Sequence, residues 1–143
     1  MLLPDVNVWL ALAFDFHSHH AAANIWYEGS SEPCAFCRWT QQGFLRLATN
    51  PMVFKEDAVS LKQAWRMYDM ILSDPRITFA GEPEGLDAYW RAYTQRRSFS
   101  PKVWSDAYLA AFARTASFEV VRMTVAPDAR ATRMISSRSL AEY

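Results

Sequence analysis

Two aspartates of this 143-residue chain, Asp5 and Asp106, stand where metal or phosphate chemistry is commonly found. Asp5 ends a short apolar run, and a helical pattern begins directly behind it. In an open parallel α/β sheet, ligands bind just outside the carboxyl ends of the strands, which is where Asp5 would lie. Asp106 lies in the predicted first turn of an alanine-rich helix. Two carboxylates in one pocket repel each other unless a cation joins them, and all-oxygen ligation suits Mg²⁺ or Mn²⁺.

Each aspartate also has a purely structural explanation. Aspartate is a preferred residue just before the first turn of a helix, so Asp5 can act as a helix cap. Asp106 can complement the helix dipole as a negative charge near a helix N-terminus. The opening segment by itself leaves capping and chemistry equally open for Asp5.

Strand and helix patterns alternate along the chain, which predicts a parallel sheet covered by helices on both faces. Strands are expected at 1–5, 34–39, 77–79 and 118–123. Helices are expected at 6–14, in a segment ending near 27, at 41–49 with Thr40 as its N-cap, across 61–72, from 82 to 93 and at 104–115. A chain of this length fits one domain with a sizeable core. If the first strand and the alanine-rich helix are neighbours, Asp5 and Asp106 meet at the carboxyl edge of the sheet.

The charge of the chain is balanced, with 15 basic and 15 acidic residues. This balance removes a whole-protein electrostatic argument for nucleic acid, but local arginines such as Arg46, Arg96 and Arg97 are candidate phosphate contacts. We expect a cytoplasmic protein without a membrane segment, because no apolar run reaches spanning length and the N-terminus lacks the basic region of a signal peptide. A nucleotide-binding or regulatory α/β domain is disfavoured, since neither a GxGxxG motif nor a P-loop occurs.

Four sequence blocks follow one another between residues 2 and 122: PDVNVWL at 4–10, HHAAA at 19–23, CRWTQQGFLRL at 37–47 with TNP at 49–51, and WSDAYLA at 104–110. Together they resemble the VapC-type PIN-domain toxins of bacterial toxin–antitoxin pairs. The resemblance implies a PIN-like three-layer α/β/α fold with a mostly parallel central sheet. It also implies an endoribonuclease that depends on Mg²⁺ or Mn²⁺, an RNA substrate, a VapB-type antitoxin and a homodimer.

The same resemblance implies the site residues. Asp5 and Asp106 match the metal-binding acids of the family, and Asn7 matches a polar residue that helps to order the site. Gln41 follows Thr40 where many PIN domains carry a glutamate. An amide in place of a carboxylate removes a charge but keeps an oxygen. The implied catalytic set is therefore Asp5, Asn7, Gln41 and Asp106. Arg46, Arg96 and Arg97 are expected as RNA contacts on the ground of their charge alone, with ordinary solvated arginines as the alternative.

The end of the last predicted strand departs from the family pattern. A Thr-Phe-Asp-Arg motif is expected after Val121, whereas residues 122–127 read RMTVAP, with Thr124 at the position of the missing acid. Asp128 comes several residues too late. Codons for 122–126 can spell Tyr-Asp-Arg-Gly in a shifted frame, so we hypothesise that the tail is out of frame, with ordinary divergence as the alternative. We accordingly divide the chain into a PIN domain at 1–125 and an atypical tail at 126–143.

Two functional interpretations follow from this departure. The first is an active metal-dependent endoribonuclease toxin. The second is a catalytically impaired PIN domain that binds its antitoxin or RNA without cleavage, because the loss of one acid weakens the binding of a divalent ion.

Overall fold

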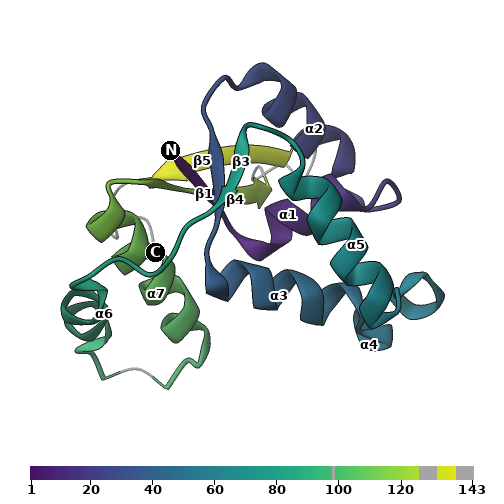
Figure 1. The fold of residues 1–143 in the computed structure, drawn as a ribbon. Helices are drawn as coiled ribbons and strands as arrows, with labels where there is room; N and C mark the ends of the chain where they lie inside the picture. Colours follow the sequence, from purple (N-terminus) through teal and green to yellow (C-terminus); the bar gives the residue numbers. More distant parts are fainter. Residues whose placement is uncertain (98, 126–131, 138–143) are drawn as a thin grey trace.

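The computed structural model describes residues 1–97, 99–125 and 132–137, and within them it contains one five-stranded sheet (Figure 1). The spatial order of the strands is β3-β2-β1-β4-β5. Four strands are parallel, and β5 pairs with β4 in the antiparallel direction. The strands are β1 (Leu2–Pro4), β2 (Cys34–Phe36), β3 (Ile77–Phe79), β4 (Glu119–Val125) and β5 (Thr132–Ser137). The predicted mostly parallel sheet is confirmed.

Helices cover both faces of this sheet, which confirms the three-layer α/β/α fold. They are α1 (Val6–Ala13), α2 (His20–Gly29), α3 (Arg38–Ala48), α4 (Pro51–Phe54), the 3₁₀ helix η1 (Lys55–Asp57), α5 (Leu61–Leu72), α6 (Leu86–Thr94) and α7 (Lys102–Ala116). Figure 1 shows α6 and α7 on one side of the sheet and α1, α3 and α5 on the other. None of the helices in the described part of the chain is long and apolar enough to cross a membrane.

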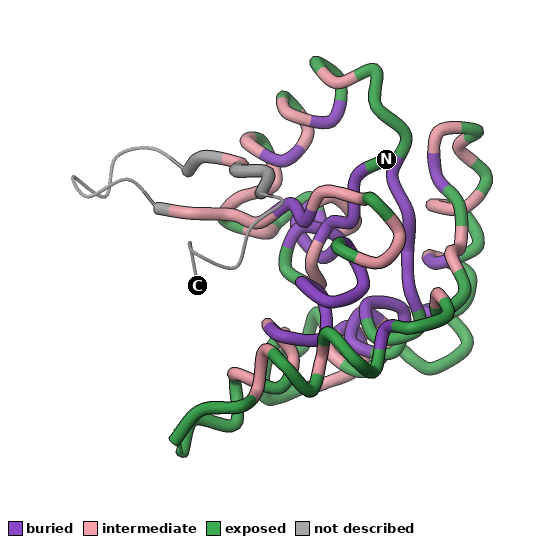
Figure 2. The backbone as a smooth tube through the Cα atoms, turned by 90° about the vertical axis from the view of Figure 1, so that its left-hand side faces the viewer, coloured by how far each residue is buried: buried purple, intermediate pink, exposed green. Residues whose placement is uncertain are grey.

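Alternate residues of a strand pack in two separate hydrophobic cores, because successive side chains of a strand point to opposite faces of the sheet. Leu2 and Val121 join the core beneath α1, α3 and α5. Leu3 and Val120 join the core beneath α6 and α7. Figure 2 shows the buried residues in the interior of the molecule; they include every residue of β1 and β2 and the inner faces of α1 and α7. This alternation decides which helix layer each residue of β4 faces.

The helix after β2 begins three residues earlier than predicted. Thr40 was expected to be its N-cap, but the cap is Cys37 and Thr40 lies in the first turn. The Thr40 hydroxyl accepts a hydrogen bond from the Cys37 backbone N–H at 3.0 Å. This is the reciprocal half of a capping box, a role that a threonine can fill at the third helical position as well as at the cap. The strand prediction to residue 39 was therefore too long, and β2 ends at Phe36.

Gly43 allows α1 and α3 to cross closely. A Cβ atom added at Gly43 would overlap the side chain of Val6, so no larger residue fits without a shift of one helix. Val6 follows Asp5 directly, and Gly43 lies between Trp39 and Arg46 on α3. The close crossing therefore sets the distance between the first turn of α1 and the surface of α3.

The tail beyond residue 125 contributes a strand to the sheet. Residues 132–137 pair with β4 in a continuous antiparallel register that runs from Val125 opposite Thr132 to Val120 opposite Ser137. Met134 packs, partly buried, against the core beneath α1. Residues 126–131 and 138–143 lie outside the described part. Pairing between β4 and β5 thus crosses the predicted domain boundary at residue 125. The hypothesis that the tail is out of frame concerns the gene and stays a prediction.

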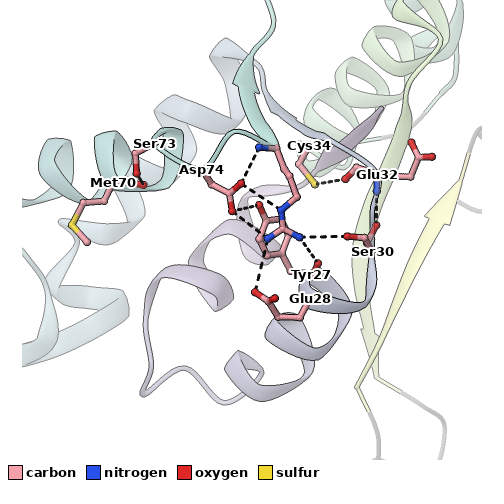
Figure 3. Close-up of polar contacts among 9 residues, drawn as sticks. Tyr27, Glu28, Ser30, Glu32, Cys34, Met70, Ser73 and Asp74 are labelled. Carbon is pink, nitrogen blue, oxygen red and sulfur yellow. Dashed lines mark hydrogen bonds and ion pairs between the residues drawn. The ribbon is translucent and has the colours of Figure 1, made fainter.

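A polar cluster around Arg76 joins the start of β2 to the end of α2 (Figure 3). The Arg76 guanidinium pairs with Asp74 at 3.2 Å and donates to the Tyr27 carbonyl at 3.3 Å. It also stacks over the Tyr27 ring, 4.0 Å from its centroid. The Tyr27 hydroxyl donates to Asp74 at 2.8 Å, and the Arg76 carbonyl accepts from the Cys34 N–H. These contacts lie at the amino ends of β2 and β3, away from the edge that carries Asp5.

We expect this cluster to make the free energy of unfolding depend on pH in the acidic range. Hydrogen bonds from Arg76 and from the Tyr27 hydroxyl lower the pKa of Asp74 from 3.8 to about 2. A carboxylate whose pKa is lower in the folded state stabilises the fold above its unfolded pKa, and that contribution is lost as the pH falls towards the folded pKa. Urea unfolding of the wild type and of Asp74→Asn should therefore differ at pH 7 and converge between about pH 4 and pH 2. A difference that is independent of pH would contradict the assignment.

Candidate active site at the carboxyl edge of the sheet

Asp5 lies at the point where β1 ends and α1 begins. Its Oδ1 atom accepts a hydrogen bond from the Val8 N–H at 3.0 Å, so Asp5 is the N-cap of α1 and the capping interpretation is confirmed. Its own N–H donates to the carbonyl of Val121, the third residue of β4, at 2.9 Å, which ties Asp5 to that strand. Burial raises the pKa of Asp5, and the Val8 N–H and the nearby Arg122 charge partly oppose that rise. A helix cap and a site carboxylate are thus the same residue.

Asp106 reaches the same place from α7. Asp106 was predicted to lie in the first turn of this helix. That prediction was wrong, because the helix begins at Lys102 and Asp106 lies in its second turn. The side chain is 26% exposed, and its charge contributes to the raised pKa of Asp5. Their role as shared metal ligands stays a prediction, but the two aspartates, about a hundred residues apart in sequence, lie close enough for their charges to interact. The physical cause is that β1 and β4 are neighbours and α7 leads directly into β4.

Arg122 is the residue of this site that the sequence analysis did not identify. It lies on β4, and its Nη2 atom forms an ion pair with Asp106 Oδ1 at 3.1 Å. Its charge also acts on Asp5, whose pKa it lowers. The signal in the sequence was the departure from the family motif at 122–124, which indicated a missing acid but not an added base.

Asn7 and Arg46 line a groove whose wall includes Val6 and Ser105, the sequence neighbours of Asp5 and Asp106, but neither aspartate itself. The groove has a volume of about 680 Å³ and lies between α1 and α3. Trp39, 39% exposed, forms part of its wall. The groove offers an amide, a guanidinium and an aromatic ring next to the acidic pair. These are groups that a polynucleotide backbone and its bases can contact.

The contacts described for the Gln41 side chain are with residues other than Asp5 and Asp106. The side chain is buried, and its Oε1 atom accepts a hydrogen bond from Arg38 Nη1. Burial raises the pKa of Tyr68, and a hydrogen bond between Tyr68 and the Gln41 side chain partly opposes this rise. These contacts tie Gln41 to α5 and not to the acidic pair. Its predicted catalytic role therefore lacks support from its contacts and stays a prediction.

Arg96 and Arg97 follow the end of α6. The Arg96 guanidinium donates to the Tyr93 carbonyl at 3.1 Å and so caps its own helix. Arg97 is exposed, and neither residue lines the groove beside the aspartates. Their predicted contact with RNA would require a path across α6 and α7, and it stays a prediction.

The donor atoms of the site suit a hard divalent ion, although they are few. Asp5 and Asp106 supply carboxylate oxygens, the ligands that Mg²⁺ and Mn²⁺ prefer, and water commonly completes such a shell. Within the described residues, no three His, Cys, Asp or Glu side chains lie close enough together to hold a metal. Thr124 lies two residues after Arg122 on β4 and therefore on the same face of the strand; the resemblance led us to expect the last acid of the family at this position.

Comparisons with known proteins agree with this architecture. No family model matches the chain. Ribonuclease VapC41 of Mycobacterium tuberculosis (strain H37Rv) is 50% identical over 127 residues, which cover 85% of this chain and 87% of that protein. Ribonuclease VapC38 of the same organism is 40% identical over 68 residues, 47% of this chain and 48% of that protein.

A solved structure is also similar to this chain in fold. It is the crystal structure of M. tuberculosis VapC20, described as a toxin that cleaves the sarcin–ricin loop. It superposes with a TM-score of 0.59 over 82% of this chain and 85% of that chain, at 13% sequence identity. At this identity the similarity supports the α/β/α fold alone.

Proposed function

This chain belongs to the VapC family of PIN-domain ribonucleases, and we propose that it is the toxin of a toxin–antitoxin pair, an Mg²⁺-dependent endoribonuclease that cleaves RNA phosphodiester bonds. The observation that carries the proposal is that Asp5 lies where β1 ends and α1 begins, with Asp106 close enough for its charge to raise the pKa of Asp5. The groove lined by Asn7 and Arg46 opens beside them. Both features lie in a chain that is 50% identical to a ribonuclease over most of its length.

The proposed roles follow from the contacts of each residue. Asp5 and Asp106 would hold the ion, which when bound supplies charge neutralisation at a phosphate and lowers the pKa of a coordinated water. The Val8 N–H holds one oxygen of Asp5 and so orients its carboxylate. Arg46 offers the groove a positive charge for a backbone phosphate, and Asn7 offers an amide. Mn²⁺ would serve in the same place.

We also propose a VapB-type antitoxin as a partner and a homodimer as the assembly. Both proposals rest on the family. Large apolar side chains exposed on neighbouring elements are consistent with a partner surface: Met52 on α4 is 91% exposed and Leu61 on α5 is 74% exposed. Co-expression with the adjacent small gene, followed by size-exclusion chromatography, tests both.

A second candidate function is favoured by one observation. Because Arg122 pairs with Asp106 and Thr124 replaces the expected acid, the chain would be an impaired PIN domain that binds antitoxin or RNA without cutting it. The two functions differ in a single measurable property, the cleavage of RNA in the presence of a divalent ion.

We expect the purified chain to cleave a mixed RNA pool with Mg²⁺ or Mn²⁺ and to lose that activity in EDTA. Asp106→Asn should lower the initial rate by at least about 100-fold, since it removes a charged ligand and keeps the shape of the side chain. Asp87→Asn is the matched control, because Asp87 is an exposed carboxylate on α6 that pairs only with Arg91 among the contacts described. This control should cleave at the wild-type rate.

Cleavage that survives both EDTA and Asp106→Asn would contradict the proposed mechanism. A folded wild type that does not cleave, yet binds RNA or its antitoxin, would establish the second candidate function.

A further inference from the structure

We propose that Arg122 is an internal counter-ion of the acidic site, so that a divalent cation binds between Asp5 and Asp106 only when Arg122 gives up its ion pair with Asp106. The inference rests on the proposed function, in that it takes these two aspartates as the ligands. It adds that Arg122 competes with the metal for Asp106, and that this competition sets the affinity of the site for the metal.

The first support is the geometry of the pair. Arg122 Nη2 and Asp106 Oδ1 are 3.1 Å apart, and the side chains are 21% and 26% exposed. A partly buried ion pair of this kind is screened less than a pair on an open surface. The guanidinium also acts on Asp5, so one positive charge serves both carboxylates. A cation bound by those carboxylates would need the same place.

The second support is that the backbone directs Arg122 into the site. Parallel pairing sets Pro4 opposite Val121, so Arg122 lies one residue past that pair, beside Asp5. Val121 faces the core beneath α1 and Val120 faces the core beneath α7. Because strand residues alternate, Arg122 shares the face of Val120 and points towards α7, which carries Asp106. Pairing with Ile135 of β5 keeps this part of β4 extended.

The third support is the balance of charge. Two aspartates and one arginine leave a net charge of −1, whereas the aspartates alone would present −2 to an incoming ion. A divalent cation must displace Arg122 from Asp106 or bind beside a like charge, and both alternatives weaken binding. Substitutions that remove the charge of Arg122 should therefore strengthen metal binding, although they remove an ion pair.

The test is the binding of Mn²⁺ alone, measured by EPR titration of the full chain without RNA. Arg122→Gln removes the charge and keeps a polar, though shorter, side chain. We expect it to bind Mn²⁺ at least about tenfold more tightly than the wild type. Arg122→Lys keeps the charge and should bind Mn²⁺ like the wild type. Thermal unfolding of each variant establishes that it is folded before it is titrated.

Equal affinities for the wild type and Arg122→Gln would overturn the inference, as would equal gains in the Gln and Lys variants. Adding Asp106→Asn to Arg122→Gln separates this failure from that of the proposed function. If the added substitution abolishes binding, the aspartates are ligands whatever Arg122 does. If binding is unchanged, the site of the proposed function is wrong and the inference falls with it.

A measurement on the wild type does not depend on any variant folding. The side-chain Nε–Hε resonance of Arg122 should shift on addition of Mg²⁺, with the same midpoint as metal binding, because the ion pair breaks as the ion enters. Binding of Mg²⁺ without a shift of this resonance would overturn the inference.

Discussion

Asp5→Asn is expected to abolish RNA cleavage while the free energy of unfolding stays within about 0.5 kcal/mol of the wild type. Asp5 has two roles, the cap of α1 and a carboxylate of the site, and this substitution separates them. Asparagine caps helices as well as aspartate does, because its side-chain oxygen can accept from the Val8 N–H. It removes the charge that a divalent ion requires. The initial cleavage rate at saturating Mg²⁺ and urea unfolding measure the two roles independently.

Asp5→Ala is the matched comparison, because it removes the cap and the charge together. It should lose cleavage and also about 1 kcal/mol of stability. Asp5→Asn with substantial cleavage would show that the charge of Asp5 is dispensable. Asp5→Asn with the stability of Asp5→Ala would show that the amide does not cap α1.

Phe36→Ala should lower the free energy of unfolding by about 3–5 kcal/mol, a large share of the stability of a domain of this size. Phe36 is fully buried at the end of β2. Its ring stacks on Trp9 with centroids 3.9 Å apart and meets Tyr68 of α5 edge-on at 5.0 Å. Truncation removes these contacts and leaves a cavity between β2, α1 and α5. Urea unfolding followed by tryptophan fluorescence measures the change.

Phe99→Ala is the control for this substitution, because Phe99 is fully exposed, and it should change stability by less than about 0.5 kcal/mol. Phe36→Leu, which keeps most of the apolar volume, should cost about 1–2 kcal/mol. If Phe36→Ala were as stable as Phe99→Ala, the aromatic cluster around Trp9 would not be the centre of the core.

The elements with strong local signals were predictable from the sequence. The strand at 77–79 has the predicted bounds, and α5 contains the apolar positions predicted for a helix there. Helical apolar spacing and a short apolar run between turns are local properties. The placement of Asp5 and Asp106 at one edge followed from a general property of parallel sheets, whose carboxyl ends face the same way. The bounds of α3 were missed because Cys37 is a weak cap and Thr40 acts from the third helical position.

The amino-acid sequence by itself determined the α/β alternation, the family and the two aspartates, since each depends on local pattern or on motifs that stand in order along the chain. Only the tertiary structure decided the partners of those residues. Gln41 accepts a hydrogen bond from Arg38, and Arg122 forms an ion pair with Asp106. Residues 132–137 form a strand that pairs with β4. Side-chain direction depends on strand register and on the neighbouring helix, which are set by contacts between distant segments. The charge that faces the aspartates is therefore a property of the folded chain.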